Sequence, residues 1–473
     1  MLILQFFTFA LAQDVEVRIR FLSDLPTTVE VEGKYASNQP RKNPRNFSLM
    51  TEYAGVTGLA ERISNIGFAD RDGKTLTNKR FNAGEYVADG DIALFRYLVD
   101  LKPPSKRSAA AHVSWIIGDA GILTLDDLMP QSSGEMISAR VKIGLPAGWK
   151  IFSTARQTKD GFFEVTNIEN ASFIIGKNWR EVNAGASKIL ISGEWQFADD
   201  EAAKMVVEIM GGYQKTFGSS ASQSTQIAFF KFPGDVPHGN WEADTRGGSV
   251  TIASSDMPFR SQSLQRLHEQ LRHEIFHLWI PSGVNLSGRY DWFYEGFALY
   301  QSLKLGVAVN RLRFEDYLDT LSRAIVIDSF GSQRRSLIDA SNNRWNGSDT
   351  QVYARGMLAA FLCDLVLLEK SKGKVSTNTL VAEIFQKHRS GTDRTDGTTA
   401  ILNIMRSHPE LVPVIDRMIT GADKFEWPAM LAAAGIEVST VNSTPVLRVV
   451  TKPSGRQKDL LDKLGYNNWR NRQ

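Results

Sequence analysis

The first third of the chain shows the alternation of apolar and polar residues that is typical of half-buried strands. Between Val15 and Phe21 the odd positions are apolar, whereas the even positions are Glu16, Arg18 and Arg20. Similar short runs recur at 28–32, 92–99, 112–117, 139–143 and 162–165, separated by turn residues. The pattern predicts an antiparallel β domain over residues 13–178, with a supporting role because no group of reactive side chains stands out in it.

After a strand at 188–192 the spacing of apolar residues becomes helical. A helix is predicted over 199–217, then a strand at 226–232, a glycine-containing loop at 238–243 and a strand at 249–253. The next helix is expected to begin near Ser261 or Ser263 and to reach Trp279, because Pro281 and Gly283 then stop it. Its apolar residues form one stripe, and two histidines lie about half a turn away from that stripe, where they can face a cleft.

Further helices are predicted near 380–388, 401–405, 412–419 and 427–431. We therefore divide the chain into a signal peptide at 1–12, the β domain at 13–178, a core at 179–300 that carries the two histidines, a mainly helical part at 301–435 and a C-terminal tail at 436–473. The basic, polar end of the tail, 451–473, is expected to be a loosely packed end.

Composition excludes several classes of protein. The 473 residues are 42% hydrophobic and 23% charged, which is normal for a globular chain with large cores and unlike disordered or fibrous proteins. The formal net charge of +3 is too small for this length to indicate a nucleic-acid surface. Cys363 is the only cysteine, so an intrachain disulfide and a cysteine-based zinc cluster are excluded, and its apolar neighbours favour a buried thiol.

The first twelve residues are apolar and end in Ala10-Leu11-Ala12, as a secretory signal peptide does. No lysine or arginine precedes the apolar run, so a buried N-terminal strand is the alternative. We expect an exported protein, periplasmic or secreted. No transmembrane span is expected later, because Asp364 interrupts the most apolar helix and no segment reaches the ~18 uncharged apolar residues required.

The sequence His273-Glu274-Ile275-Phe276-His277 places two imidazoles on one helix face with a carboxylate beside them. Zinc and the water that it activates require this arrangement, together with a third protein ligand and an open position. Glu295, near the start of a helix expected from about Asp291, is the candidate third ligand, because the intervening loop is long enough to reverse the chain. A chance match on a solvent face is the alternative.

These residues resemble the gluzincin metallopeptidases, and within them the glycyl and alanyl-type aminopeptidase families. The two histidines are followed by Trp279 and by Glu295-Gly296-Phe297-Ala298. Tyr353-Ala354-Arg355-Gly356 is similar to the segment whose tyrosine stabilises the oxyanion in these families. Gly239-Asn240-Trp241-Glu242-Ala243 is similar to the element whose glutamate recognises the free amino group of the substrate. The segment from Tyr353 to Ser376 and the domain order are closer to the glycyl family, with its PDZ domain missing.

The resemblance implies a multidomain α+β fold, in which an N-terminal antiparallel β domain precedes a thermolysin-like zinc catalytic domain and a C-terminal helical part. It also implies one zinc ion per chain, held by His273, His277 and Glu295. Glu274 would be the general base. Tyr353 would stabilise the oxyanion, unless it is a plain core tyrosine. Glu242 would bind the substrate, unless it is an ordinary loop carboxylate.

We therefore expect a zinc-dependent aminopeptidase that hydrolyses peptide bonds near free N-termini. A zinc endopeptidase and a peptide-binding protein that retains the metal without turnover are the alternatives. Three departures from the families' patterns leave the substrate preference open: a shortened spacer before Glu295, residues 280–285 in place of a basic segment, and the missing PDZ domain. The altered 239–243 segment keeps the peptide-binding alternative open. Peptides are the expected partners, and the sequence does not indicate the oligomeric state.

Overall fold

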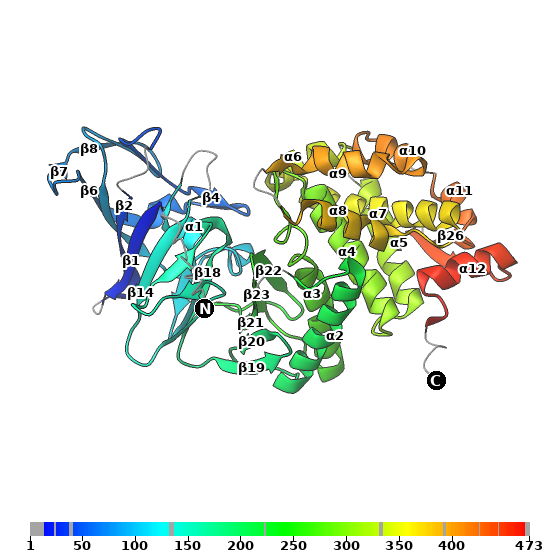
Figure 1. The fold of residues 1–473 in the computed structure, drawn as a ribbon. Helices are drawn as coiled ribbons and strands as arrows, with labels where there is room; N and C mark the ends of the chain where they lie inside the picture. The colour runs from blue at the N-terminus through cyan, green and yellow to red at the C-terminus, as the bar shows by residue number, and fades with distance from the viewer. Residues whose placement is uncertain are drawn as a thin grey trace, which may run out of the picture. The chain divides into compact units, whose positions relative to one another are not determined.

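The computed structural model describes residues 14–22, 25–36, 41–131, 137–221, 224–330, 334–390, 394–424, 426–442 and 444–468. The predicted signal peptide at 1–12 lies outside these residues. The chain, which Figure 1 colours from blue to red by residue number, divides into two compact units. Of the described residues, unit 1 contains those up to Val182, those at 186–194 and those at 224–255, and unit 2 contains those at 183–185 and 195–221 and those from Asp256 onward. The predicted domain boundaries stay a prediction.

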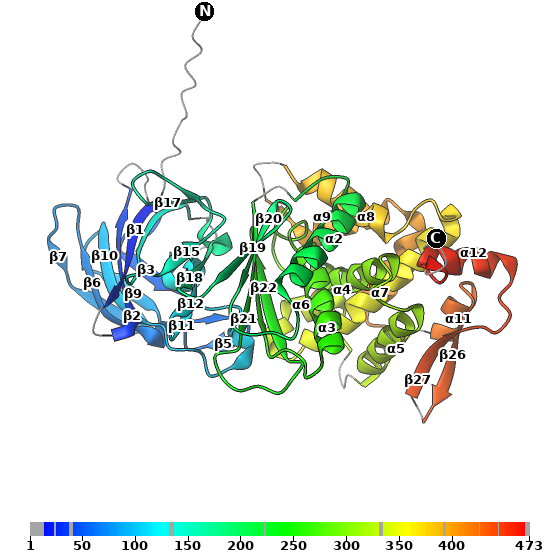
Figure 2. The same cartoon turned by 90° about the horizontal axis from the view of Figure 1, so that it is seen from below.

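Unit 1 is rich in β-sheet, as Figure 2 shows. Its largest sheet has the order β16-β17-β14-β1-β2-β10-β6-β7. The pairing of β1 with β14 is parallel, whereas β1 with β2 and β2 with β10 are antiparallel. The predicted alternation in β1 is confirmed, since Val17 and Ile19 are buried and Arg18 is exposed. The strands of this sheet are β1 (Val15–Leu22), β2 (Leu25–Tyr35), β6 (Ile63–Ala69), β7 (Thr75–Leu76), β10 (Leu94–Asp100), β14 (Ala139–Gly144), β16 (Arg156–Gln157) and β17 (Phe163–Val165).

Two four-stranded sheets, of order β13-β3-β9-β8 and β11-β12-β18-β15, accompany the largest sheet. Apolar side chains from all three meet in one core, which contains Phe47, Tyr97 and Phe173. The strands are β3 (Asn46–Leu49), β8 (Asn78–Asn82), β9 (Glu85–Ala88), β11 (Trp115–Ile117), β12 (Ala120–Thr124), β13 (Pro130–Gln131), β15 (Lys150–Phe152) and β18 (Ser172–Gly176), and a short helix, α1 (Leu125–Leu128), follows β12.

A five-stranded sheet has the order β19-β20-β21-β23-β22. Its strands are β19 (Arg180–Ala184), β20 (Ser187–Ile191), β21 (Thr225–Lys231), β22 (Trp241–Arg246) and β23 (Ser249–Ser254). β20, β21 and β23 are parallel, and β22 pairs antiparallel with β23 at the edge. The predicted loop at 238–243 is therefore wrong in its second half, because Trp241, Glu242 and Ala243 pair with β23 and extend the strand that precedes the Gly247-Gly248 turn.

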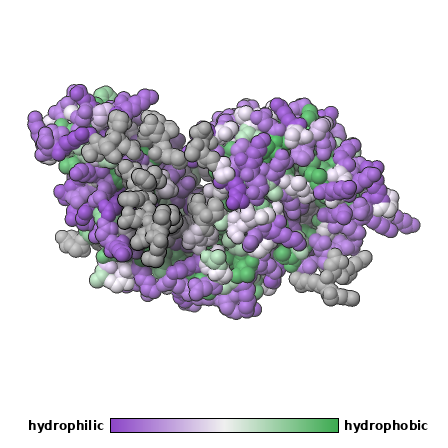
Figure 3. Space-filling view, viewed as in Figure 1, coloured by the Kyte–Doolittle hydropathy of each residue, from purple (hydrophilic) through white to green (hydrophobic). Residues whose placement is uncertain are grey.

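Unit 2 is mainly helical and has buried apolar side chains along each long helix. Its helices are α2 (Asp199–Phe217), α3 (Arg260–Phe276), α4 (Asp291–Ala308), α5 (Phe314–Phe330), α6 (Leu337–Asn342), α7 (Asp349–Ser371), α8 (Thr377–His388), α9 (Gly397–Arg406), α10 (Val412–Val414), α11 (Trp427–Ala432) and α12 (Gly455–Leu464). Short strands β24 (Leu286–Ser287) and β25 (Thr395–Asp396) pair, as do β26 (Ile436–Val441) and β27 (Thr444–Val449). The face of unit 2 visible in Figure 3 is mostly hydrophilic.

The described end of the chain is more ordered than its polar composition indicates. Ser454 caps α12 by accepting a hydrogen bond from Gln457 N, and Gly465 ends the helix with a positive φ of 99°. Leu460, Leu461 and Leu464 are buried. The expectation of a loosely packed end is therefore wrong for 455–464, because three leucines at helical spacing supply an apolar face.

α7 is long and apolar enough to cross a membrane by length and composition alone. Of its most apolar window, 83% is buried inside the protein, which is usual for a core helix. Asp364, whose charge interrupts the apolar run, accepts hydrogen bonds from Tyr300 Oη and Thr377 N and pairs with Lys304.

Candidate metal centre

The local sequence of α3 explains why its two histidines face the same way. Leu267, Leu271 and Ile275 are buried at four-residue spacing, which fixes the rotation of the helix about its axis. α3 packs against both α2 and α4. Tyr213 Oη of α2 donates to the carbonyl oxygen of Arg272 at 2.6 Å, directly before the first histidine. The rotation leaves His273 and His277 together on another face.

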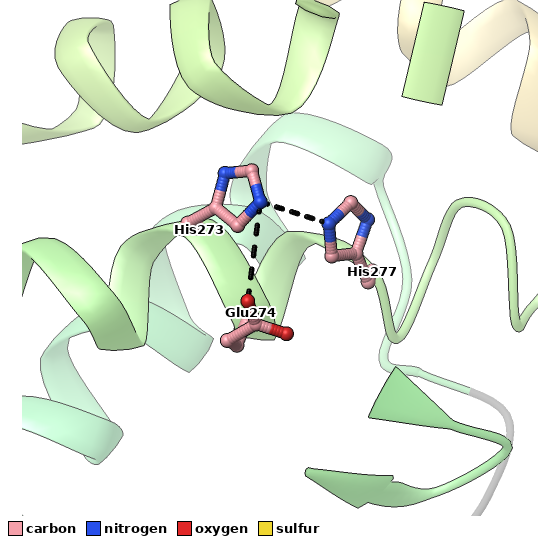
Figure 4. Close-up of side chains that lie close together, drawn as sticks. All are labelled: His273, Glu274 and His277. Carbon is pink, nitrogen blue, oxygen red and sulfur yellow. Dashed lines mark hydrogen bonds and ion pairs between the residues drawn. The ribbon is translucent and has the colours of Figure 1, made fainter. Parts of the chain in front are cut away.

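Figure 4 shows the imidazole rings of His273 and His277 turned toward each other, with Glu274 below them. The two Nε2 atoms are 3.2 Å apart, and Glu274 Oε1 is 3.9 Å from His273 Nε2. All three side chains are buried. His277 Nδ1 lies 3.1 Å from the carbonyl oxygen of Ile280, which can only accept, so Nδ1 carries the proton and the lone pair of Nε2 is available to a metal.

Glu295 of α4 brings a third candidate ligand atom close to the two imidazoles. Its Oε2 lies 3.2 Å from His273 Nε2 and 3.6 Å from His277 Nε2. Oε2 is buried and has no hydrogen-bond partner among the described residues. Ligands that bind zinc tetrahedrally at about 2.05 Å are separated by about 3.3 Å. The three separations in the structure are close to that value, so the donor atoms fit a zinc ion.

The electrostatics of Glu295 favour the ionised form that a ligand requires. Burial opposes ionisation, but the Arg344 guanidinium and the two histidines hold the pKa of the Glu295 carboxyl well below its usual value. Burial also opposes protonation of His277, whereas the adjacent Glu295 carboxylate raises the pKa of His277 overall. The site thus attracts positive charge, either as protons or as a cation.

Tyr353, in the second turn of α7, stands next to these groups. Its ring centroid is 6.3 Å from that of His273. Burial and the nearby Glu295 carboxylate raise the pKa of Tyr353 well above its usual value, so the phenol stays protonated and can donate a hydrogen bond. The structure therefore brings together His273, His277, Glu274, Glu295 and Tyr353, while the role of each residue stays a prediction.

The close approach of α4 and α7 depends on two glycines. A Cβ on Gly296 would overlap the backbone of Gly356, and a Cβ on Gly356 would lie 2.8 Å from Gly296 Cα. Glu295 directly precedes the first glycine, and Tyr353 lies three residues before the second. Close helix packing at this pair thus sets the positions of the carboxylate and the phenol together.

Glu242, the predicted substrate-binding residue, is half-buried on β22 and belongs to unit 1, whereas the other predicted site residues belong to unit 2. Its role stays a prediction. On the same strand, the Asp244 carboxylate accepts a 2.7 Å hydrogen bond from Arg246 Nε.

Arg344 is a further residue of the site that no sequence pattern predicts. Its Nη1 donates to Glu295 Oε1 at 3.0 Å, and its Nη2 donates to Tyr353 Oη at 2.6 Å. Arg344 follows Glu295 by 49 residues and sits in a short 3₁₀ turn, Arg344–Asn346, so no periodic pattern connects the two. The only signal in the sequence is an arginine shortly before the helix that carries Tyr353.

No known protein-family profile matches the chain, and no curated protein matches it. Solved structures, in contrast, are similar to the chain. An aminopeptidase N family protein from Idiomarina loihiensis has a TM-score of 0.74 and 16% identity, covering 93% of this chain and 82% of that one. An M1 zinc metallopeptidase from Deinococcus radiodurans has a TM-score of 0.54 and 16% identity, covering 88% and 94%. A mutant of the Deinococcus enzyme bound to a Tyr-Ser-Ala substrate has a TM-score of 0.56 and 15% identity, covering 88% and 95%.

The chain has an aminopeptidase-like fold. The β-rich N-terminal region and the helical C-terminal part are those expected of this architecture. At 15–16% identity the likeness concerns the fold, so the chemistry has to be argued from the residues of the site.

Proposed function

We propose that the chain is a zinc-dependent aminopeptidase that cleaves peptide bonds near free N-termini. One observation carries the proposal: His273 Nε2, His277 Nε2 and Glu295 Oε2 converge with separations of 3.2–3.6 Å, in the geometry of three zinc ligands. The proposal includes membership of the gluzincins, a thermolysin-like arrangement of the catalytic domain, and motifs nearest to those of the glycyl aminopeptidases.

The residues of the site divide the chemistry among them. Bound zinc would supply a Lewis acid that polarises the scissile carbonyl and lowers the pKa of water. Glu274 takes the proton of the attacking water and passes it to the leaving amine. Tyr353 donates its phenolic hydrogen bond to the developing oxyanion, a contribution of about 3 kcal/mol for one such donor. Glu242 pairs with the protonated N-terminus and so positions the scissile bond.

Replacement of Glu274 by glutamine tests this division of roles. The variant keeps the shape of the side chain but loses the base, so we expect kcat to fall by about 10²–10⁴ with zinc content unchanged at one ion per chain. Glu269→Gln is the matched control, because Glu269 is on the same helix, is exposed and pairs only with Arg266 in the described residues. Hydrolysis of aminoacyl p-nitroanilides and metal analysis measure both quantities.

Three outcomes would contradict the proposal in different ways. A protein without zinc, or one whose activity survives Glu274→Gln, refutes the metal chemistry. Equal cleavage of a peptide and of its N-acetylated form indicates an endopeptidase. Zinc-dependent peptide binding without cleavage by the unaltered protein indicates a binding protein that retains the metal.

A further inference from the structure

Arg344 occupies an unusual position in unit 2. It is 7% exposed and lies in the turn between α6 and α7. Its guanidinium donates to four oxygen atoms, namely Asp349 Oδ1 at 3.0 Å from Nε, Asp291 Oδ1 at 2.8 Å and Glu295 Oε1 at 3.0 Å from Nη1, and Tyr353 Oη at 2.6 Å from Nη2. A buried arginine is stable only when its donors are satisfied in this way.

The four oxygens come in two pairs with helical spacing. Asp291 and Glu295 are four residues apart on α4, and Asp349 and Tyr353 are four residues apart on α7. Residues at this spacing lie on one face of a helix. One planar guanidinium therefore bridges the facing sides of the two helices. The compact ammonium group of a lysine could not donate hydrogen bonds to all four oxygens.

The N–H donors of Arg344 determine which hydrogen bonds Tyr353 and Glu295 can make. A guanidinium has only N–H donors and no acceptor. Tyr353 Oη must therefore accept from Nη2, and its own proton is not used in this bond. The proton remains for another acceptor, and a phenol that accepts one hydrogen bond becomes a stronger donor in the next.

Glu295 is oriented by the same group. Arg344 occupies Oε1, whereas Oε2 faces His273 Nε2 at 3.2 Å and His277 Nε2 at 3.6 Å. The carboxylate is thus held so that one defined oxygen is presented to the proposed metal. Hydrogen bonds to the far side of a ligand typically raise metal affinity about 10–100-fold.

We propose that Arg344 is a positioning residue that couples the metal ligand Glu295 to the oxyanion donor Tyr353, selecting the ligating oxygen of the first and the direction of the phenolic proton of the second. The inference rests on the proposed peptidase function, but its metal half can be tested without turnover. A purely structural ion pair between the two helices would not act on the phenol.

Arg344→Gln and Arg344→Lys, each made alone and in the Tyr353→Phe background, distinguish a positioning role from a purely structural ion pair. We expect Arg344→Gln to weaken zinc binding about 10-fold in competition with a chelator and to lower kcat about 10–100-fold, with a much smaller change in KM. In the Tyr353→Phe background the same substitution should lower kcat only a few-fold, because the phenolic proton is already absent. Lysine should not restore kcat, since it cannot bridge both helices.

Arg355→Lys is the matched control for loss of a buried arginine. Arg355 is 1% exposed and donates to the carbonyl oxygens of Arg417, Met418, Gly421 and Asp423 and to the Asp328 carboxylate. The Arg355→Lys substitution should lower the free energy of unfolding with little change in zinc affinity.

Equal loss of kcat from Arg344→Gln with and without Tyr353, or unchanged zinc affinity in the variant, overturns the inference. If the unaltered protein binds zinc but cleaves no peptide, the proposed function fails, and the zinc affinity of Arg344→Gln alone then decides the positioning role.

Discussion

Two clusters of histidine and glutamate are built around the histidines of α3, and they differ in what their ring nitrogen atoms face. At the first cluster, Arg272 Nη1 donates to His268 Nδ1 at 2.5 Å, and His268 Nε2 lies 3.0 Å from Glu208 Oε2. Because arginine only donates, Nδ1 accepts and Nε2 carries the proton. Neither ring nitrogen of His268 has a free lone pair, so His268 cannot bind a metal.

At the second cluster, the position four residues after His273 is another histidine instead of an arginine. Three candidate ligand atoms, the two Nε2 atoms and Glu295 Oε2, then converge without an arginine between them. Converging lone pairs in a buried place are costly unless a proton or a cation lies among them. A histidine pattern therefore indicates a metal site only when its candidate ligand atoms converge.

The largest expected difference between the clusters is the loss of zinc and activity when a histidine of the second cluster is replaced. His277→Gln removes a proposed zinc ligand at the second cluster, so we expect zinc content to fall from about one ion per chain to near zero, and peptidase activity to fall at least ~10³-fold. Metal analysis after dialysis and rates with aminoacyl p-nitroanilides measure these. Full zinc content in the variant would show that His277 is not a ligand.

A second difference concerns two glycines of α4, one beside each cluster. A Cβ on Gly296 would meet the backbone of Gly356, whereas a Cβ on Gly306 would lie 2.9 Å from Arg272 Cζ, the far end of a flexible side chain. We expect Gly296→Ala to lower the free energy of unfolding by about 1–3 kcal/mol and to weaken zinc binding.

Gly306→Ala is the matched control. Its milder contact is offset by the helix preference of alanine, about 1 kcal/mol, so its stability should change little. Urea unfolding of both variants, with and without zinc, measures the effect. Equal losses would mean that the contact of α4 with α7 is not what positions Glu295.

The smallest effect on activity is expected for His268→Gln, which should leave zinc content and kcat within about threefold at neutral pH. Its effect lies in acid stability. Burial and the Arg272 charge lower the pKa of His268 to about 4, below its value of about 6.5 in the unfolded chain. The unfolded state thus binds more protons between these values, and stability is complete above pH 6.5 and decreases as pH falls toward 4.

Between pH 8 and pH 5 this histidine should account for a decrease of about 2 kcal/mol in the free energy of unfolding. Denaturant unfolding of His268→Gln over that range should show a flatter pH dependence than the unaltered protein. A parallel dependence in both proteins would mean that His268 does not titrate as this geometry requires.

Much of the fold follows from periodic patterns in the sequence. The predicted helix at 199–217 matches α2, and the helix expected from about Asp291 begins at Asp291. The predicted zinc-site helix begins within a few residues of α3 and continues past Phe276 as turns to Trp279. These elements are predictable because their apolar spacing reports directly on which face is buried.

Other elements were predicted wrongly where local signals conflict with pairing or packing. Glycine and asparagine before Trp241 indicate a loop, yet pairing with β23 turns 241–243 into strand. The polar composition after 451 hides the three leucines that bury one face of α12. In both places the partner that decides the structure is distant along the chain.

The placement of His273 and His277 on one helix face beside Glu274 follows from the sequence alone, because four residues make about one turn. Only the tertiary structure decided which oxygen of Glu295 faces the two histidines and which group holds it there. Arg344 is 49 residues from Glu295 and 9 from Tyr353, and nothing in either spacing predicts a contact. Helix periodicity is a local property of the chain, whereas the choice of a through-space partner depends on how α4, α7 and the turn before α7 pack.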